Sequence, residues 1–190
     1  MNSAYIEQCL NKIKDRKSKN AFFESIMNDP SAIVLHEENA HKTVLFPGNK
    51  GPKTSTWKQT KQMAFDLNKA GYDVAFIPEP ESEKGADAIV KFSHYDYKIV
   101  DFKYSTTKLA NTLQKNLIDG FSQTSTIVLR IKNMDAGLLS EVLAYLGRNE
   151  RKKEFRFGEI YFLNKYGEIL HIDRSNIRRN NYKKKLKGFF

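Results

Sequence analysis

The chain has 190 residues and a formal net charge of +10, with 40% hydrophobic and 12% aromatic residues. This length and apolar content predict one folded domain with an appendage and exclude wholesale disorder, while the positive charge favours a polyanionic partner, most often nucleic acid. A single cysteine excludes an internal disulfide and a cysteine-based zinc site.

The first fifty residues are predicted to form an appendage of their own. Residues 3–28 carry an amphipathic pattern typical of one helix or two short ones, and residues 32–35 and 43–46 read as short strands. Residues 47–55 are rich in Pro, Gly, Lys and Thr and predict a loop. We therefore expect an N-terminal helical appendage over residues 1–50, a main domain over residues 51–175 and a basic tail over residues 176–190.

The main domain is predicted to alternate strands and helices. Its helices are expected at about 57–70, 108–121 and 136–146, and its strands at 72–77, 86–92, 97–104, 125–131, 155–163 and 168–172. This order predicts an α+β fold with one mainly antiparallel sheet and helices packed on it. For the tail, the sequence leaves helical and disordered conformations both open. No apolar run approaches the ~18 residues of a membrane span, and the N-terminus lacks a signal-peptide core, so we expect no membrane partner.

Three charged residues on the strand pair 86–92 and 97–104 form the strongest candidate site. Strand side chains alternate between faces, so Asp101 and Lys103 share one face, and Asp87 on the neighbouring strand is expected near them. Two carboxylates and an ammonium are costly to desolvate unless they pair or bind something. In a basic protein, that something is predicted to be a phosphodiester. The alternative is a strand edge with ordinary charges. Lys103 is expected to be a surface lysine, whose replacement changes stability by under about 0.5 kcal/mol.

Two catalytic chemistries remain open for this pattern. In one, Asp87 and Asp101 hold Mg²⁺ or Mn²⁺ through oxygen ligands, and Lys103 stabilises the developing charge, as in a metal-dependent deoxyribonuclease of the PD-(D/E)xK type. The other follows from a wider match. The stretch IVDFKYSTTKLANTLQKNLIDGFSQTSTIVLRI, with Asp87 before it and Arg174 after the last hairpin, resembles the C-terminal ribonuclease domains of contact-dependent inhibition toxins, in the barnase/EndoU/colicin/RelE-like group.

This resemblance covers about residues 55–175 and implies a toxin-like ribonuclease, plausibly acting on tRNA without a metal or other cofactor. The ribose 2′-OH would attack the adjacent phosphate, with Asp101 orienting Lys103. The remaining candidates for catalysis are Thr107, His171 and Arg174. The resemblance also implies an immunity protein as a partner, delivery from another cell as part of a larger protein, and action in the cytoplasm.

Exposed cations are expected to bind the nucleic-acid backbone. They are Lys53, Lys58, Lys61, Arg178, Arg179, Lys183, Lys184 and Lys185. If they bind without catalysis, the protein would be a non-enzymatic nucleic-acid-binding module of a phage or mobile element. The oligomeric state is not predicted by the sequence.

Overall fold

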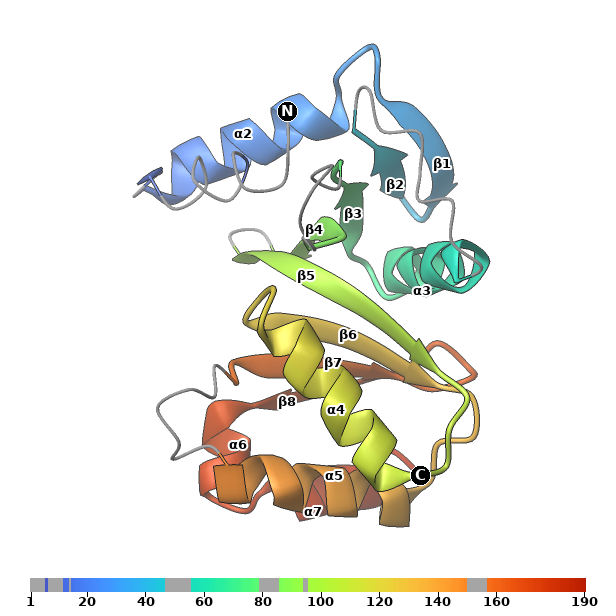
Figure 1. Cartoon of the computed structure of the whole chain (residues 1–190). Coiled ribbons are helices and arrows are strands. Elements are labelled where there is room, and N and C mark those ends of the chain that lie inside the picture. Colours follow the sequence, from blue (N-terminus) through green and yellow to red (C-terminus); the bar gives the residue numbers. More distant parts are fainter. Residues whose placement is uncertain are drawn as a thin grey trace. The chain divides into compact units, whose positions relative to one another are not determined.

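The structure, a computed structural model, describes residues 6, 12–13, 15–46, 56–78, 86–93, 96–149 and 157–190. The chain divides into two units, Met1–Val100 and Asp101–Phe190. This division falls within one long strand, β5 (Asp96–Ser105), whereas the sequence predicted boundaries after residues 50 and 175. Figure 1 gives the element labels, and each unit is described by itself.

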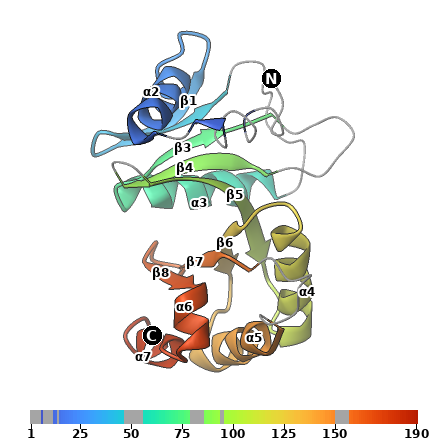
Figure 2. The same ribbon diagram turned by 90° about the vertical axis from the view of Figure 1, so that its left-hand side faces the viewer.

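Unit 1 is a sheet covered by a helix on each face (Figure 2). Its elements are α2 (Arg16–Met27), β1 (Ile33–Glu38), β2 (His41–Leu45), α3 (Trp57–Lys69), β3 (Asp73–Phe76), β4 (Ala88–Ser93) and the first half of β5. The strands lie in the order β1-β2-β3-β4-β5. Only the β2–β3 pair within this unit is parallel, and the other pairs are antiparallel.

The alternation of side chains along the strands separates the two faces of unit 1. Phe23 and Ile26 of α2 cluster with Ala75 of β3 and Ile89 of β4. The adjacent strand residues point the other way, toward α3, where the buried Thr43 hydroxyl donates a 2.7 Å hydrogen bond to Asn68. Helix α2 therefore shares the core of the sheet.

Unit 2 packs the four helices described in it against one face of its strands. Its elements are the second half of β5, α4 (Ala110–Phe121), β6 (Thr126–Ile131), α5 (Ala136–Asn149), β7 (Glu159–Leu163), β8 (Ile169–Asp173), α6 (Arg174–Arg178) and α7 (Tyr182–Lys187). The strand order is β5-β6-β7-β8, with β6–β7 parallel and β7–β8 antiparallel.

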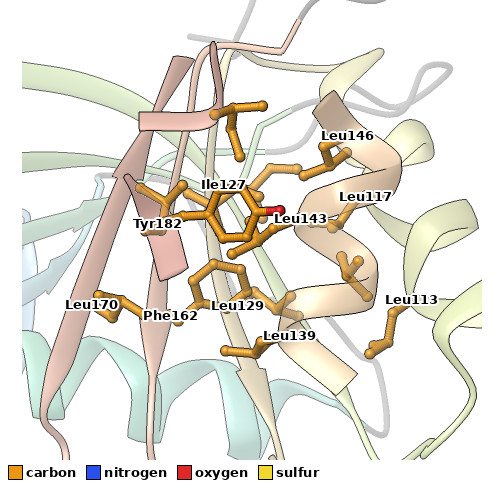
Figure 3. Close-up of a cluster of buried hydrophobic side chains, with 14 of the residues drawn as sticks. Leu113, Leu117, Ile127, Leu129, Leu139, Leu143, Leu146, Phe162, Leu170 and Tyr182 are labelled. Carbon is orange, nitrogen blue, oxygen red and sulfur yellow. The ribbon is translucent and has the colours of Figure 1, made fainter. Parts of the chain in front are cut away.

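The core of unit 2 is a single apolar cluster between the sheet and the helices (Figure 3). Leu113 and Leu117 of α4 and Leu143 of α5 are fully buried against Ile127 and Phe162 of the strands. The C-terminal segment contributes Tyr182 and Leu186, which are 4% exposed each. The basic tail is thus helical, and its apolar residues belong to this core.

The predicted α+β class with a mainly antiparallel sheet is confirmed. The predicted loop at residues 47–55, the turn residues 94–95, and residues 79–85 and 150–156 lie outside the described residues. Within the part of the chain that the structure describes, none of the helices combines the length and apolarity that crossing a membrane requires.

Candidate active site

Asp101 and Lys103 of β5 form an ion pair on the helix-covered face of unit 2. The Lys103 Nζ lies 2.6 Å from Asp101 Oδ2. The Asp101 side chain is 3% exposed and the Lys103 side chain 26% exposed. Strand alternation explains the shared face, since Phe102 between them points away. The carboxylate is therefore buried, while the ammonium keeps access to solvent.

Gly120 lets helix α4 approach this pair closely. A Cβ at Gly120 would lie 2.7 Å from Ile127 Cδ1, 2.9 Å from Asp101 Oδ2 and 3.2 Å from Lys103 Cε. Any side chain at this position would collide with the carboxylate and the core beneath it. Sequence reasoning did not single out Gly120, although a glycine near the C-terminal end of a predicted helix interior is itself a signal of close packing.

One oxygen of the pair keeps unused hydrogen-bonding capacity. Asp101 Oδ2 is buried and makes no hydrogen bond of acceptable geometry within the described structure, although the Lys103 ammonium lies at ion-pair distance. A carboxylate oxygen has two lone pairs, and the Lys103 ammonium faces this one as its charged partner. This oxygen is suited to accept a bond from a substrate, a water molecule or a cation.

Asp87 belongs to unit 1 and directly precedes β4. Its N–H donates to the Val100 carbonyl at 3.0 Å, and its carbonyl accepts from the Ile77 N–H at 3.0 Å. The next residue, Ala88, pairs with Val100 across the β4–β5 ladder. The backbone of Asp87 is therefore fixed, whereas the predicted cluster of its carboxylate with Asp101 and Lys103 stays a prediction.

His171 lies on the opposite face of unit 2's sheet from Lys103. Ile127 of β6 faces α4, so its neighbour Val128 faces the other side. Val128 pairs with Tyr161 of β7, and Tyr161 pairs with His171 of β8, which places all three on that second face. The sheet thus separates two residues that the sequence grouped as catalytic candidates.

His171 instead has a carboxylate partner that sequence reasoning missed. Its Nε2 lies 2.7 Å from Glu159 Oε2, and its ring stacks on Tyr161 with centroids 4.4 Å apart. The Thr126 hydroxyl donates to the other Glu159 oxygen at 3.2 Å. Strand parity in the predicted hairpin could have found Glu159, because a residue two positions before Tyr161 shares its face.

Arg174 begins helix α6, whereas Thr107 lies in the turn before α4. The Thr107 hydroxyl accepts a hydrogen bond from the Leu109 N–H at 3.0 Å, in the turn that precedes α4. Arg174 is the exposed first residue of α6, directly after Asp173, whose side chain caps that helix. Burial tends to raise the pKa of Asp173, but hydrogen bonds from Ser175 and Asn176 outweigh it and hold the pKa below its ordinary value.

The predicted phosphate-binding cations divide between the units. Lys58 and Lys61 lie on α3 in unit 1, with Lys61 Nζ 5.5 Å from the centroid of the Trp57 ring. The five C-terminal cations are all exposed in unit 2: Arg178, Arg179, Lys183, Lys184 and Lys185. Lys53 lies outside the described residues. Over the described ranges, no group of three or more His, Cys, Asp or Glu side chains gathers as a metal site would require.

No protein-family model and no curated protein matches the sequence. Among solved structures, the chain is similar to a CdiA-CT/CdiI toxin and immunity complex from Burkholderia pseudomallei. The similarity has a TM-score of 0.45 and 20% sequence identity, and it covers 69% of this chain and 98% of that chain. At this TM-score and sequence identity, the similarity does not assign a function to this chain.

Proposed function

We propose that this protein is a nuclease whose centre is the Asp101–Lys103 pair. The observation that carries the proposal is a buried carboxylate that pairs at 2.6 Å with an ammonium that reaches solvent. Phosphodiester cleavage builds negative charge on the phosphorus oxygens, and a preorganised cation stabilises that charge. Lys103 supplies the cation, and Asp101 fixes its position.

RNA, and tRNA in particular, is the proposed substrate, on the basis of the sequence resemblance to toxin ribonucleases. In this chemistry the 2′-OH loses its proton and attacks the neighbouring phosphate, and Lys103 neutralises the phosphorane. The P–O5′ bond then breaks, which leaves a 2′,3′-cyclic phosphate and a 5′-oxygen that takes up a proton. Because His171 and Lys103 lie on opposite faces of unit 2's sheet, we propose that the proton of the 2′-OH goes to a group other than His171. His171 and Glu159 then form a pair separate from the cleavage centre.

A metal-dependent deoxyribonuclease is the second candidate, and the buried Asp101 carboxylate favours it. Carboxylate oxygens are the ligands that Mg²⁺ and Mn²⁺ prefer. Asp101 would hold the ion, together with Asp87 if the predicted cluster forms. When bound, such an ion would polarise the phosphate and activate a water molecule. Lys103 would remain the cation that meets the phosphate oxygens.

One experiment separates these candidates. Purified protein is incubated with total tRNA and with plasmid DNA, each with EDTA and with added Mg²⁺ or Mn²⁺, and the products are resolved on gels. Cleavage of tRNA in EDTA supports the first candidate, and cleavage of DNA only with metal supports the second. Retained binding without any cleavage would rule out both and leave a nucleic-acid-binding module.

The biological setting is proposed from the same sequence resemblance. The nuclease would act as a toxin in the cytoplasm of a target cell, after delivery as part of a larger protein. Its producer would need an immunity protein to block the site. Growth arrest on induced expression, relieved by exchanging Lys103, is the outcome expected of such a toxin.

A further inference from the structure

A groove of about 630 Å³ lies in unit 2 between α5 and the segment of α6 and α7. Its lining comes from these helices and the turn between α6 and α7, so the groove is distinct from the β5 site of Asp101 and Lys103. The volume falls within the range of about 300–1,000 Å³ typical of ligand sites. The groove therefore has room for a group the size of one nucleotide.

Small residues on α5 create this space. Ala144 and Gly147 are three positions apart and lie on the same face of the helix, where both line the groove. A Cβ at Gly147 would lie 3.3 Å from Ile177 Cγ2, so α6 packs closely against this glycine. The floor is completed by Leu143 and by Tyr182, which is 4% exposed.

The rim of the groove is cationic. Arg148 at the end of α5 and Arg178 at the end of α6 line it from two sides, and both are exposed. The C-terminal segment, residues 174–190, carries seven Lys or Arg residues and no Asp or Glu. A guanidinium donates two parallel hydrogen bonds to a phosphate, which makes a pair of arginines a good phosphate site.

We propose that this groove binds one nucleotide unit of an RNA strand. Arg148 and Arg178 hold its phosphate, and the apolar floor with Tyr182 receives its base. An acidic peptide would satisfy the two arginines, but it would leave the apolar floor without a matching partner. The inference rests on the proposed RNA substrate, and it assigns to α5 and α6 the role of holding the strand outside the cleavage centre.

The test is the affinity of the full-length protein for a fluorescent 2′-O-methyl RNA, measured in EDTA so that neither candidate chemistry cleaves the probe. Arg148→Ala removes one phosphate ligand, and Ala144→Leu fills the groove without changing charge. Each is expected to weaken binding about tenfold, the effect of losing one charge-assisted contact. Lys132→Ala and Ser140→Leu are matched controls outside the groove and outside the basic C-terminal segment, and both should bind within about twofold of wild type.

Three results would overturn the groove assignment: wild-type affinity in both groove variants, no RNA binding by the wild type, or competition by polyglutamate as strong as by RNA of equal charge. Thermal unfolding checks that each variant is folded. If Ala144→Leu does not fold, the result for Arg148→Ala is used alone, because Arg148 is exposed. Cleavage is scored separately on unmodified RNA. If the protein cleaves RNA but both groove variants bind it like wild type, the groove assignment is refuted and the nuclease proposal stands. If the groove variants weaken binding but no cleavage occurs, the nuclease proposal is refuted and the groove assignment stands.

Discussion

Replacing Lys103 by methionine should destabilise the protein, because it leaves the Asp101 carboxylate buried without its counter-charge. Methionine keeps a similar length and packing but carries no charge. Lys98→Met is a matched control on the same strand. Lys98 also follows an aspartate by two residues, and its Nζ lies 3.3 Å from Asp96 Oδ2, but the Asp96 side chain is 47% exposed.

The size of the effect follows from burial. Removing one partner of a buried ion pair costs about 3–5 kcal/mol. Because the Lys103 side chain is 26% exposed, water screens part of this pair, and we expect a loss of about 2–4 kcal/mol. The Lys98 side chain is 19% exposed, but its partner carboxylate is 47% exposed, so Lys98→Met leaves no buried carboxylate without a counter-charge and should cost about 0–1 kcal/mol. This corrects the expectation from sequence, which treated Lys103 as a surface lysine.

Urea unfolding followed by far-UV circular dichroism measures both variants against wild type. The double variant Asp101→Asn with Lys103→Met should recover part of the loss, since no buried charge then remains. Equal stability of Lys103→Met and Lys98→Met, each within about 0.5 kcal/mol of wild type, would contradict the assignment of Asp101 as a buried carboxylate that depends on Lys103.

Three further outcomes are expected. Gly120→Ala should lower stability by about 1–3 kcal/mol through overpacking, despite the gain in helix propensity, whereas Gly188→Ala at the exposed end of α7 should not; thermal unfolding of both variants tests this. Leu143→Ala should cost about 2–5 kcal/mol in the same assay, because Leu143 is fully buried. Asp173 has a lowered pKa in the folded state, so its stabilising contribution should be present above the ordinary aspartate pKa of about 3.9 and be lost as pH falls below it. Asp173→Ala should flatten that acid limb of a stability–pH curve, and an unchanged limb would argue against the helix cap.

Local patterns predicted the elements of the fold well. The alternating apolar runs predicted β4, β5 and β6, and the leucines at spacing four predicted α4, whose Leu113 and Leu117 are fully buried. The same parity argument put Asp101 and Lys103 on one face. These predictions depend only on residues that are close together along the chain, so they can be made from the sequence alone.

Contacts between elements that are far apart in the chain could not be predicted from the sequence. Parity placed Asp101 on a face but did not indicate that α4 would cover it at Gly120, so its burial was missed. The prediction for the C-terminal segment considered only its cations. It missed Tyr182 and Leu186, whose spacing of four residues is typical of a buried helix face. His171 was likewise grouped with Lys103, although only the strand register reveals that the sheet lies between them.

The most direct test of the central claim is the cleavage rate of Lys103→Met under conditions where it is fully folded, compared with wild type and Lys98→Met. The substrate and metal condition are those in which the wild type cleaves. Loss of a charge that stabilises the phosphorane predicts a rate about 100- to 1,000-fold below wild type, with Lys98→Met close to wild type. A folded Lys103→Met that cleaves at the wild-type rate would contradict the assignment of the active site to this pair.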